Sequence, residues 1–206
     1  MHYGQTLKYA FHVIFHPVDG FWDLKREKKG SLSAAFTIVL LTILTLTLEK
    51  QKTGFLFNTY RLEYINVVVD IMTVMLLYVL WSVSGWCLTS LMDGEGTFRD
   101  ILIATGYAFF PIPLIRLPLI LVSHVLTQSE GEFYTIFGTF CYIWVGFLIF
   151  MGTLVTHQYS VKKTILTCLL TAVGMGIILF IGLLFFNVIQ QMLTFVTTIY
   201  REIRFR

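Results

Sequence analysis

The sequence is short of charge. Of its 206 residues, 13% are Asp, Glu, Lys or Arg, about half the share of roughly 25% that is usual in soluble domains. By contrast, 56% of the residues are hydrophobic and the mean hydropathy is +0.76. This composition argues against a sizeable soluble domain and indicates an integral membrane protein. The net charge of +3 is too small to suggest a nucleic-acid partner.

Cysteine is also scarce. Cys87, Cys141 and Cys168 each lie inside an apolar segment and are far apart in the sequence. An odd, widely spaced set argues against a disulfide framework and against a zinc site, so we expect small apolar packing residues there. No metal, cofactor or soluble small-molecule substrate is expected. Residues 1–16 lack the apolar core and cleavage site of a signal peptide.

Long apolar runs dominate what is present. Each run can cross a bilayer, which needs about 20 residues, and a helix satisfies its own backbone hydrogen bonds in lipid. The sequence therefore predicts an all-α polytopic membrane protein with one five-helix membrane domain over residues 31–192. The five spans are expected at about residues 31–48, 64–91, 98–126, 133–156 and 164–187.

Residues 1–30 predict an amphipathic segment that precedes the first span. An apolar stripe recurs there at helical spacing, interrupted by Pro17 and followed by a basic run. A helix in the lipid interface would place aromatic residues at the membrane boundary and basic residues among the phosphates. A solvated charged helix fits equally well. The stripe is Tyr3, Leu7, Phe11 and Ile14, and the expected interfacial residues are Phe21, Trp22, Lys25 and Arg26.

The last apolar segment is too long for one span. From Thr164 to Arg206 a single helix would extend roughly 60 Å, about twice the hydrocarbon thickness. Residues 188–206 keep an apolar stripe at helical spacing. This amphipathic extension either lies on the membrane surface or projects with a stripe that a partner helix would cover.

The basic run before the first span sets the expected orientation. Lysine and arginine favour the cytoplasmic side, and the first helix usually dominates. With five spans, the N-terminus is then inside and the C-terminus outside.

The most polar interior stretch is MDGEGTFRD, residues 92–100. As a calcium loop it has Phe98 where glycine is required and Ala104 where the twelfth-position glutamate is required. A phosphate-binding loop needs Gly-Lys-Ser/Thr, which is absent. A phosphatidyltransferase needs further aspartates, and no acid follows Asp100 until Glu130. An intramembrane aspartyl protease needs two aspartates within facing spans, and only Asp70 lies well inside one. The sequence therefore predicts no enzyme.

A structural interpretation of the same stretch fits better. Thr97 and Asp100 have the spacing of a capping box, which satisfies free amides at a helix start. Glycines let the chain reverse between the second and third spans. The expected turn on the inner face, which is also a candidate docking point for a partner, comprises Asp93, Gly94, Glu95, Gly96, Thr97 and Asp100.

Three prolines follow in the third span, at Pro111, Pro113 and Pro118. Each removes a backbone donor, so the helix must kink or break, and the freed carbonyls need partners inside the protein.

This pattern resembles a known family. A Gly-x-Gly-x-Phe-basic-Asp turn, then Gly106-Tyr107 and a proline-broken helix within five spans, is similar to the Yip-one (Ypt-interacting protein) membrane family. His16-Pro17 and Gly20-Phe21 resemble its bacterial members. The long cytosolic N-terminus of eukaryotic members is absent, so Rab-GTPase binding is not carried over. The resemblance implies a non-enzymatic protein of the bacterial inner membrane, of a kind that can accompany ABC transporters as an accessory subunit.

Ionisable residues inside spans are costly and are functional candidates. Asp70 and Arg116 lie at compatible depths in consecutive antiparallel spans, so we expect them to pair, directly or through water. A static pair that fixes helix register is favoured over a transport role. Two small-xxx-small pairs, Gly85/Thr89 and Ala172/Gly176, permit close helix approach, either within the chain or between chains.

The leading functional hypothesis is a non-catalytic accessory or scaffold subunit that docks on another membrane protein. The permease subunits of an ABC transporter are the partner that the resemblance implies, and membrane lipids surround both. The alternative is a channel or carrier in its own right, possibly a homo-oligomer, with Asp70, Arg116 and the broken third helix lining the path.

Overall fold

The computed structural model describes residues 3–58 and 65–204. Five stretches in this part of the chain are long and apolar enough to cross a membrane, and no strand occurs in it, which confirms the expected fold class. The predicted start of the second span at Tyr64 lies outside the described residues. In order, the elements are α1 (Tyr3–Phe15), α2 (Pro17–Arg26), α3 (Leu32–Lys52), α4 (Val67–Leu91), α5 (Phe98–Ala108), α6 (Pro111–Val122), η2 (Gln128–Glu130), α7 (Gly131–His157) and α8 (Val161–Arg204).

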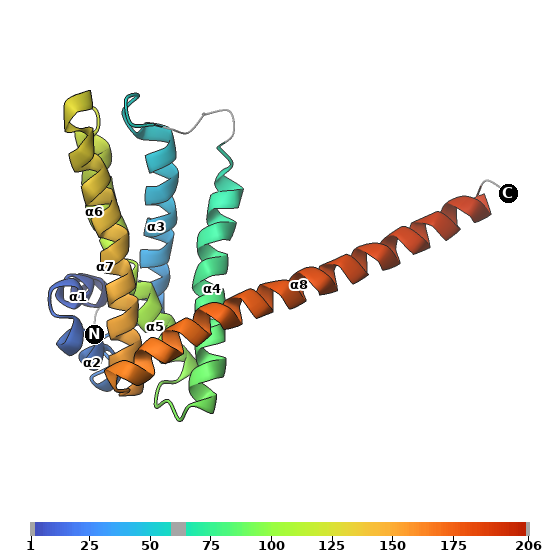
Figure 1. Cartoon of the computed structure of the whole chain (residues 1–206), viewed down its shortest axis with the longest axis horizontal. Coiled ribbons are helices and arrows are strands. Elements are labelled where there is room, and N and C mark those ends of the chain that lie inside the picture. Colours follow the sequence, from blue (N-terminus) through green and yellow to red (C-terminus); the bar gives the residue numbers. More distant parts are fainter. Residues whose placement is uncertain (1–2, 59–64, 205–206) are drawn as a thin grey trace.

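The spans α3, α4, α5 with α6, and α7 lie alongside one another as a bundle, and α1 and α2 pack against one end of it (Figure 1). Helix α8 begins at that same end, crosses α4 and leaves the bundle obliquely. The helix is continuous through the expected boundary between residues 187 and 188. Its buried residues are Thr164, Thr167 and Thr171, all near its start.

The third span is broken as two helices. Helix α5 ends at Ala108, and α6 begins at Pro111 after Phe109 and Phe110. Pro111 and Pro113 lie in the first turn of α6, where a missing N–H removes no intrahelical hydrogen bond. Pro118 lies inside α6 without ending it.

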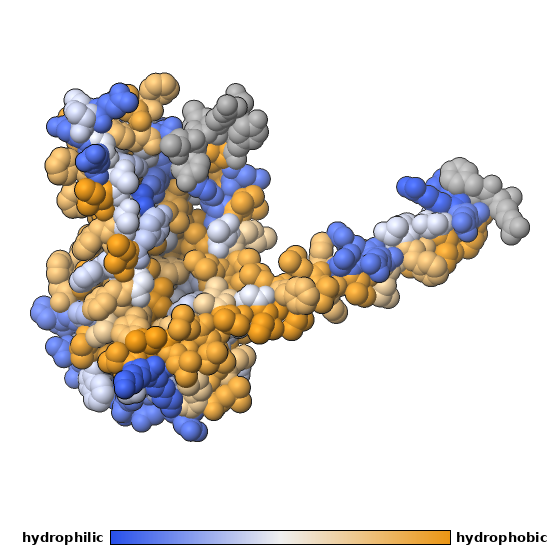
Figure 2. All heavy atoms as spheres, viewed as in Figure 1, coloured by the Kyte–Doolittle hydropathy of each residue, from blue (hydrophilic) through white to orange (hydrophobic). Residues whose placement is uncertain are grey.

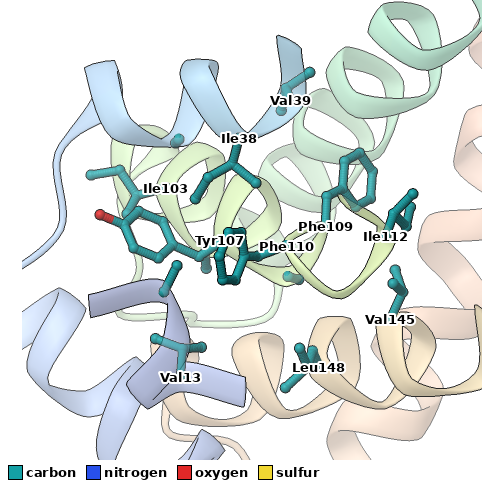
Figure 3. Packing of buried hydrophobic residues seen from close by; sticks show 14 of the residues in the cluster. Val13, Ile38, Val39, Ile103, Tyr107, Phe109, Phe110, Ile112, Val145 and Leu148 are labelled. Carbon is teal, nitrogen blue, oxygen red and sulfur yellow. The ribbon is translucent and has the colours of Figure 1, made fainter. Parts of the chain in front are cut away.

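The core surrounds the junction of α5 and α6 (Figure 3). Tyr107 is fully buried and donates its hydroxyl to the carbonyl of Thr6 on α1, at 2.8 Å. Gly106 meets α3 so closely that an added Cβ would lie 2.7 Å from the Cβ of Ala35. Ile38 and Leu148 close the core from α3 and α7. Helix α5 is thus the centre of the bundle.

The N-terminal helices differ from the expectation in which side chains face outward. Phe21 was expected at the interface but is 1% exposed, with its ring against Gly152 of α7. Trp22 is 46% exposed, and Arg26 lies 5.3 Å over its ring. On α1 the expected stripe is divided, because Ile14 is buried whereas Phe11 is exposed. The two helices therefore bury one side in the bundle and present the other outward.

Candidate functional site

Charged side chains gather at the end of the bundle where α3 ends and α4 begins, and hydrophilic residues are visible there in Figure 2. They surround a cavity of ≈ 370 Å³ that we call the polar cleft. Its walls come from α3, α4, α6 and α7. The lining residues are Leu46, Glu49, Lys50, Val69, Asp70, Thr73, Val74, Arg116 and Tyr142.

Asp70 and Arg116 both line this cleft, but each makes its ion pair with a residue of α3. The Nζ of Lys50 donates to Oδ1 of Asp70 at 2.5 Å. Arg116 pairs with Glu49 through Nη1, and its Nη2 donates to the carbonyl of Gly138 at 3.1 Å. The described residues thus show no direct Asp70–Arg116 ion pair, and pairing of the two through water stays a prediction.

Asp70 and Arg116 find partners on α3 because the first span is longer than the sequence predicts. Helix α3 continues to Lys52, four residues beyond the expected end at residue 48. The predicted span stops before Glu49 and Lys50, although these residues follow the apolar run without a glycine or proline and so could extend its helix. Their side chains instead reach α6 and α4 in the last turn of α3.

Local structure explains the position of Asp70. Asn66 caps α4, with Oδ1 accepting from the N–H groups of Val68 and Val69 at 3.0 and 3.4 Å. Asp70 is in the first turn, where the positive end of the helix dipole favours a carboxylate. The cleft therefore lies at the end of the spans and not at their middle.

The opposite end of the bundle holds residues 92–97, which we call the clasped turn. Lys163 donates to the carbonyl of Met92 at 2.6 Å, and the Tyr159 hydroxyl donates to the same oxygen at 3.0 Å. Burial, and then the charge of Asp93, raise the pKa of Tyr159, so its hydroxyl keeps its proton. Added Cβ atoms at Gly94 and Gly96 would lie 2.5 Å from Nδ1 and 2.7 Å from Cε1 of His157.

Helix α2 also binds the clasped turn. Glu95 accepts from Lys25 at 3.4 Å and from Arg26 at 3.0 Å, and Lys25 donates to the carbonyl of Thr156 at 2.7 Å. Lys25 and Arg26, the two residues expected among lipid phosphates, thus make ion pairs within the chain. Asp93 is exposed, with a left-handed φ of 55°.

The capping box is present at the start of α5. The N–H of Thr97 donates to Oδ2 of Asp100 at 3.0 Å, and Oγ1 of Thr97 accepts from the N–H of Asp100 at 3.3 Å. In the described residues, no three His, Cys, Asp or Glu side chains lie close enough together to hold a metal ion.

Apolar spans, ion pairs at one end and a turn held by hydrogen bonds at the other define a multi-span helical membrane protein. The Yip1 domain matches residues 11–193, and the chain belongs to that family. This match covers all five spans apart from the last part of α8. No curated protein and no solved structure matches the chain.

Proposed function

We propose that the chain is a non-catalytic accessory or scaffold subunit that docks on another integral membrane protein through α8. The observation that supports this is the exposure of α8: beyond Thr171, its residues up to Arg204 are exposed or half-buried. A helix of 44 residues spans about 66 Å at 1.5 Å per residue, more than a bilayer crossing requires. Such a helix can reach a neighbouring protein in the membrane and beyond it.

The small residues of α8 support a protein helix as the occupant. Gly85 and Thr89 of α4 are buried in the bundle, and Gly85 faces Thr171. The equivalent pair on α8, Ala172 and Gly176, is exposed, and an added Cβ at Gly176 would meet nothing within 4 Å. Small residues four apart let two membrane helices approach closely. Contact with lipid chains does not require small residues, so the pair favours a protein helix as the neighbour. The far part of α8 is polar on one side and apolar on the other in Figure 2.

The partner class is the permease part of an ABC transporter in a bacterial cytoplasmic membrane, which is what the resemblance implies. Yip1-family proteins interact with other proteins. Glu95 already binds Lys25 and Arg26, so the clasped turn offers only Asp93 as a free acidic contact for a cytosolic partner.

Gly176→Leu is expected to reduce the amount of co-purified membrane partner by about tenfold or more, because a leucine prevents close helix approach at an open glycine. The measurement is quantitative mass spectrometry after purification from the native host in a mild detergent. Gly146→Leu is the matched control, since Gly146 of α7 is exposed and an added Cβ there also meets nothing within 4 Å. Equal recovery with both variants would contradict docking through this face of α8.

We also propose the orientation that the basic run before the first span predicts, with the N-terminus inside and the C-terminus outside. In a cysteine-free background, a cysteine at Glu130 is expected to react with a membrane-impermeant maleimide added to intact cells. A cysteine at Asp93 is expected to react only after lysis, because the two exposed residues lie at opposite ends of the bundle. Labelling of the Asp93 position in intact cells would reverse the orientation.

The polar cleft favours a second candidate, a channel or carrier. Asp70 and Arg116 do line one cavity, as a transport path would require. The middle of the bundle is nevertheless closed by Tyr78, Tyr107 and Leu148, each 0% exposed. Conduction or transport by the purified chain in liposomes would favour this candidate over the scaffold.

A further inference from the structure

Two charged groups in the polar cleft each keep one polar atom without a hydrogen-bond partner among the described residues: Oδ2 of Asp70 and Nε of Arg116. The two residues are 7% and 8% exposed, so these atoms are also cut off from solvent. A buried charged group without its full set of hydrogen bonds is unfavourable, and such exceptions need an explanation. The cleft therefore lacks one N–H donor for Asp70 and one oxygen acceptor for Arg116.

The net charge of the cleft restricts the class of ligand that it can bind. Glu49 and Asp70 balance Lys50 and Arg116, so the site is neutral as a whole. In a low-dielectric setting, a ligand with net charge would introduce an uncompensated charge, whereas a zwitterion would not. The matching ligand carries an ammonium and an anionic oxygen group close together.

The place of the cleft indicates where such a ligand is found. Lys50 is in the last turn of α3 and Asp70 in the first turn of α4, and Arg116 is six residues, about 9 Å, from the end of α6. This is the depth of lipid headgroups. Leu46, Val69 and Val74 give the cleft apolar walls, which suit the start of a lipid chain.

We propose that the polar cleft binds the phosphoethanolamine headgroup of a membrane lipid, with the primary ammonium donating to Asp70 and the phosphate accepting from Arg116. The volume of ≈ 370 Å³ falls in the usual range of roughly 300–1,000 Å³ for ligand sites. A primary ammonium has three N–H donors, as lysine does, whereas the quaternary ammonium of phosphocholine has none. The cleft therefore discriminates between these two zwitterions by one hydrogen bond. This site does not depend on docking through α8.

The test uses the full chain in mild detergent, titrated with dihexanoyl phosphatidylethanolamine and, separately, dihexanoyl phosphatidylcholine. The thermal unfolding midpoint reports binding. We expect the ethanolamine lipid to bind about tenfold more tightly or better, the usual effect of one hydrogen bond to a charged group. Equal binding of the two lipids would overturn the proposal.

Asp70→Asn is expected to reduce this preference to about one, because a neutral amide no longer favours an ammonium. Thr73→Val is the matched control: Thr73 also lines the cleft, but its hydroxyl donates to the carbonyl of Val69 in its own helix, at 2.7 Å. This variant is expected to keep the preference. Retention of the preference by Asp70→Asn would contradict the assignment of Asp70.

A methylation series on the wild-type chain gives the same answer should Asp70→Asn fail to fold. Monomethyl and dimethyl ethanolamine lipids keep an N–H, so binding is expected to fall mainly at the third methyl group. An equal loss of affinity with each added methyl group, or no loss at all, would overturn the proposal. Soluble glycerophosphoethanolamine, tested against soluble glycerophosphocholine, separates the sources, because both are neutral zwitterionic phosphodiesters like the lipid headgroups. Binding as tight as that of the lipid would support the site but exclude a specifically lipid ligand, whereas much weaker binding would support the lipid.

Discussion

Arg116→Met is expected to destabilise the chain by about 3–5 kcal/mol, the usual cost of removing one partner of a buried ion pair. The guanidinium makes the ion pair with Glu49, a hydrogen bond to Gly138 and a stacking contact 4.6 Å from the Tyr142 ring. Its loss leaves the Glu49 carboxylate, 14% exposed, without its arginine partner and with a long hydrogen bond of 3.5 Å from Tyr134. The measurement is reversible unfolding in detergent micelles.

Three further variants distinguish the loss of the Glu49–Arg116 ion pair from non-specific destabilisation of the fold. Glu49→Met combined with Arg116→Met is expected to recover much of the loss, because both charges are then gone. Arg26→Met, at an arginine whose side chain is 47% exposed, is expected to change stability by about 1 kcal/mol or less. Exchange of the two charges in Asp70→Arg with Arg116→Asp is not expected to rescue, since each residue has its own partner on α3. Recovery in that exchange, or additive losses at Glu49 and Arg116, would contradict the observed pairing.

The features predicted well from the sequence are those set by local chemistry. Five apolar runs give five spans because lipid requires continuous helix, and the Thr97–Asp100 cap depends on residues three apart. The broken third span follows from Pro111 and Pro113 in the same way. None of these features depends on how the helices are arranged around one another.

Which side of each helix faces inward was harder to predict, because lipid and protein core are both apolar. Phe21 and Trp22 are adjacent aromatic residues, yet one is buried and the other exposed. The seam between α4 and α8 is instead made by small polar residues: Ser84 donates to the carbonyl of Thr171 at 2.8 Å, and Thr167 is 1% exposed. Hydropathy therefore identifies a span but not its buried face, whereas serine, threonine and glycine positions carry that information in a membrane protein.

The ion pairs show a second limit. Matching Asp70 to Arg116 by depth needed the correct ends of all the neighbouring helices, and a difference of four residues at the end of α3 changed both partners. Helix ends are the least certain part of a sequence-based assignment. The closeness of Asp70 and Arg116 was within reach of the prediction, because both residues line the same cleft.

Gly106→Val is expected to be as damaging as the loss of Arg116, at about 3 kcal/mol or more. An added Cβ at Gly106 would lie 2.7 Å from the Cβ, 3.1 Å from the Cα and 3.2 Å from the carbonyl oxygen of Ala35. Two of these atoms are backbone, so the strain cannot be relieved by a change of side-chain rotamer, and α3 must move away from α5. Because α5 is the centre of the bundle, that movement also disturbs the hydrogen bond between Tyr107 and Thr6. Unfolding in detergent micelles and resistance to trypsin would measure the effect.

Two controls accompany the Gly106 variants. One makes the same substitution at a glycine in open space, and the other removes the atom that the new side chain would meet. Gly182→Val in α8, where nothing lies within 4 Å of an added Cβ, is expected to change stability by about 1 kcal/mol or less. Gly106→Ala is expected to be milder than Gly106→Val, and Ala35→Gly should partly restore it by removing the nearest atom. Equal effects of Gly106→Val and Gly182→Val would contradict the close contact of α3 with α5. Partial rescue by Ala35→Gly would assign the strain to this one crossing, on which the arrangement of α1, α3 and α5 depends.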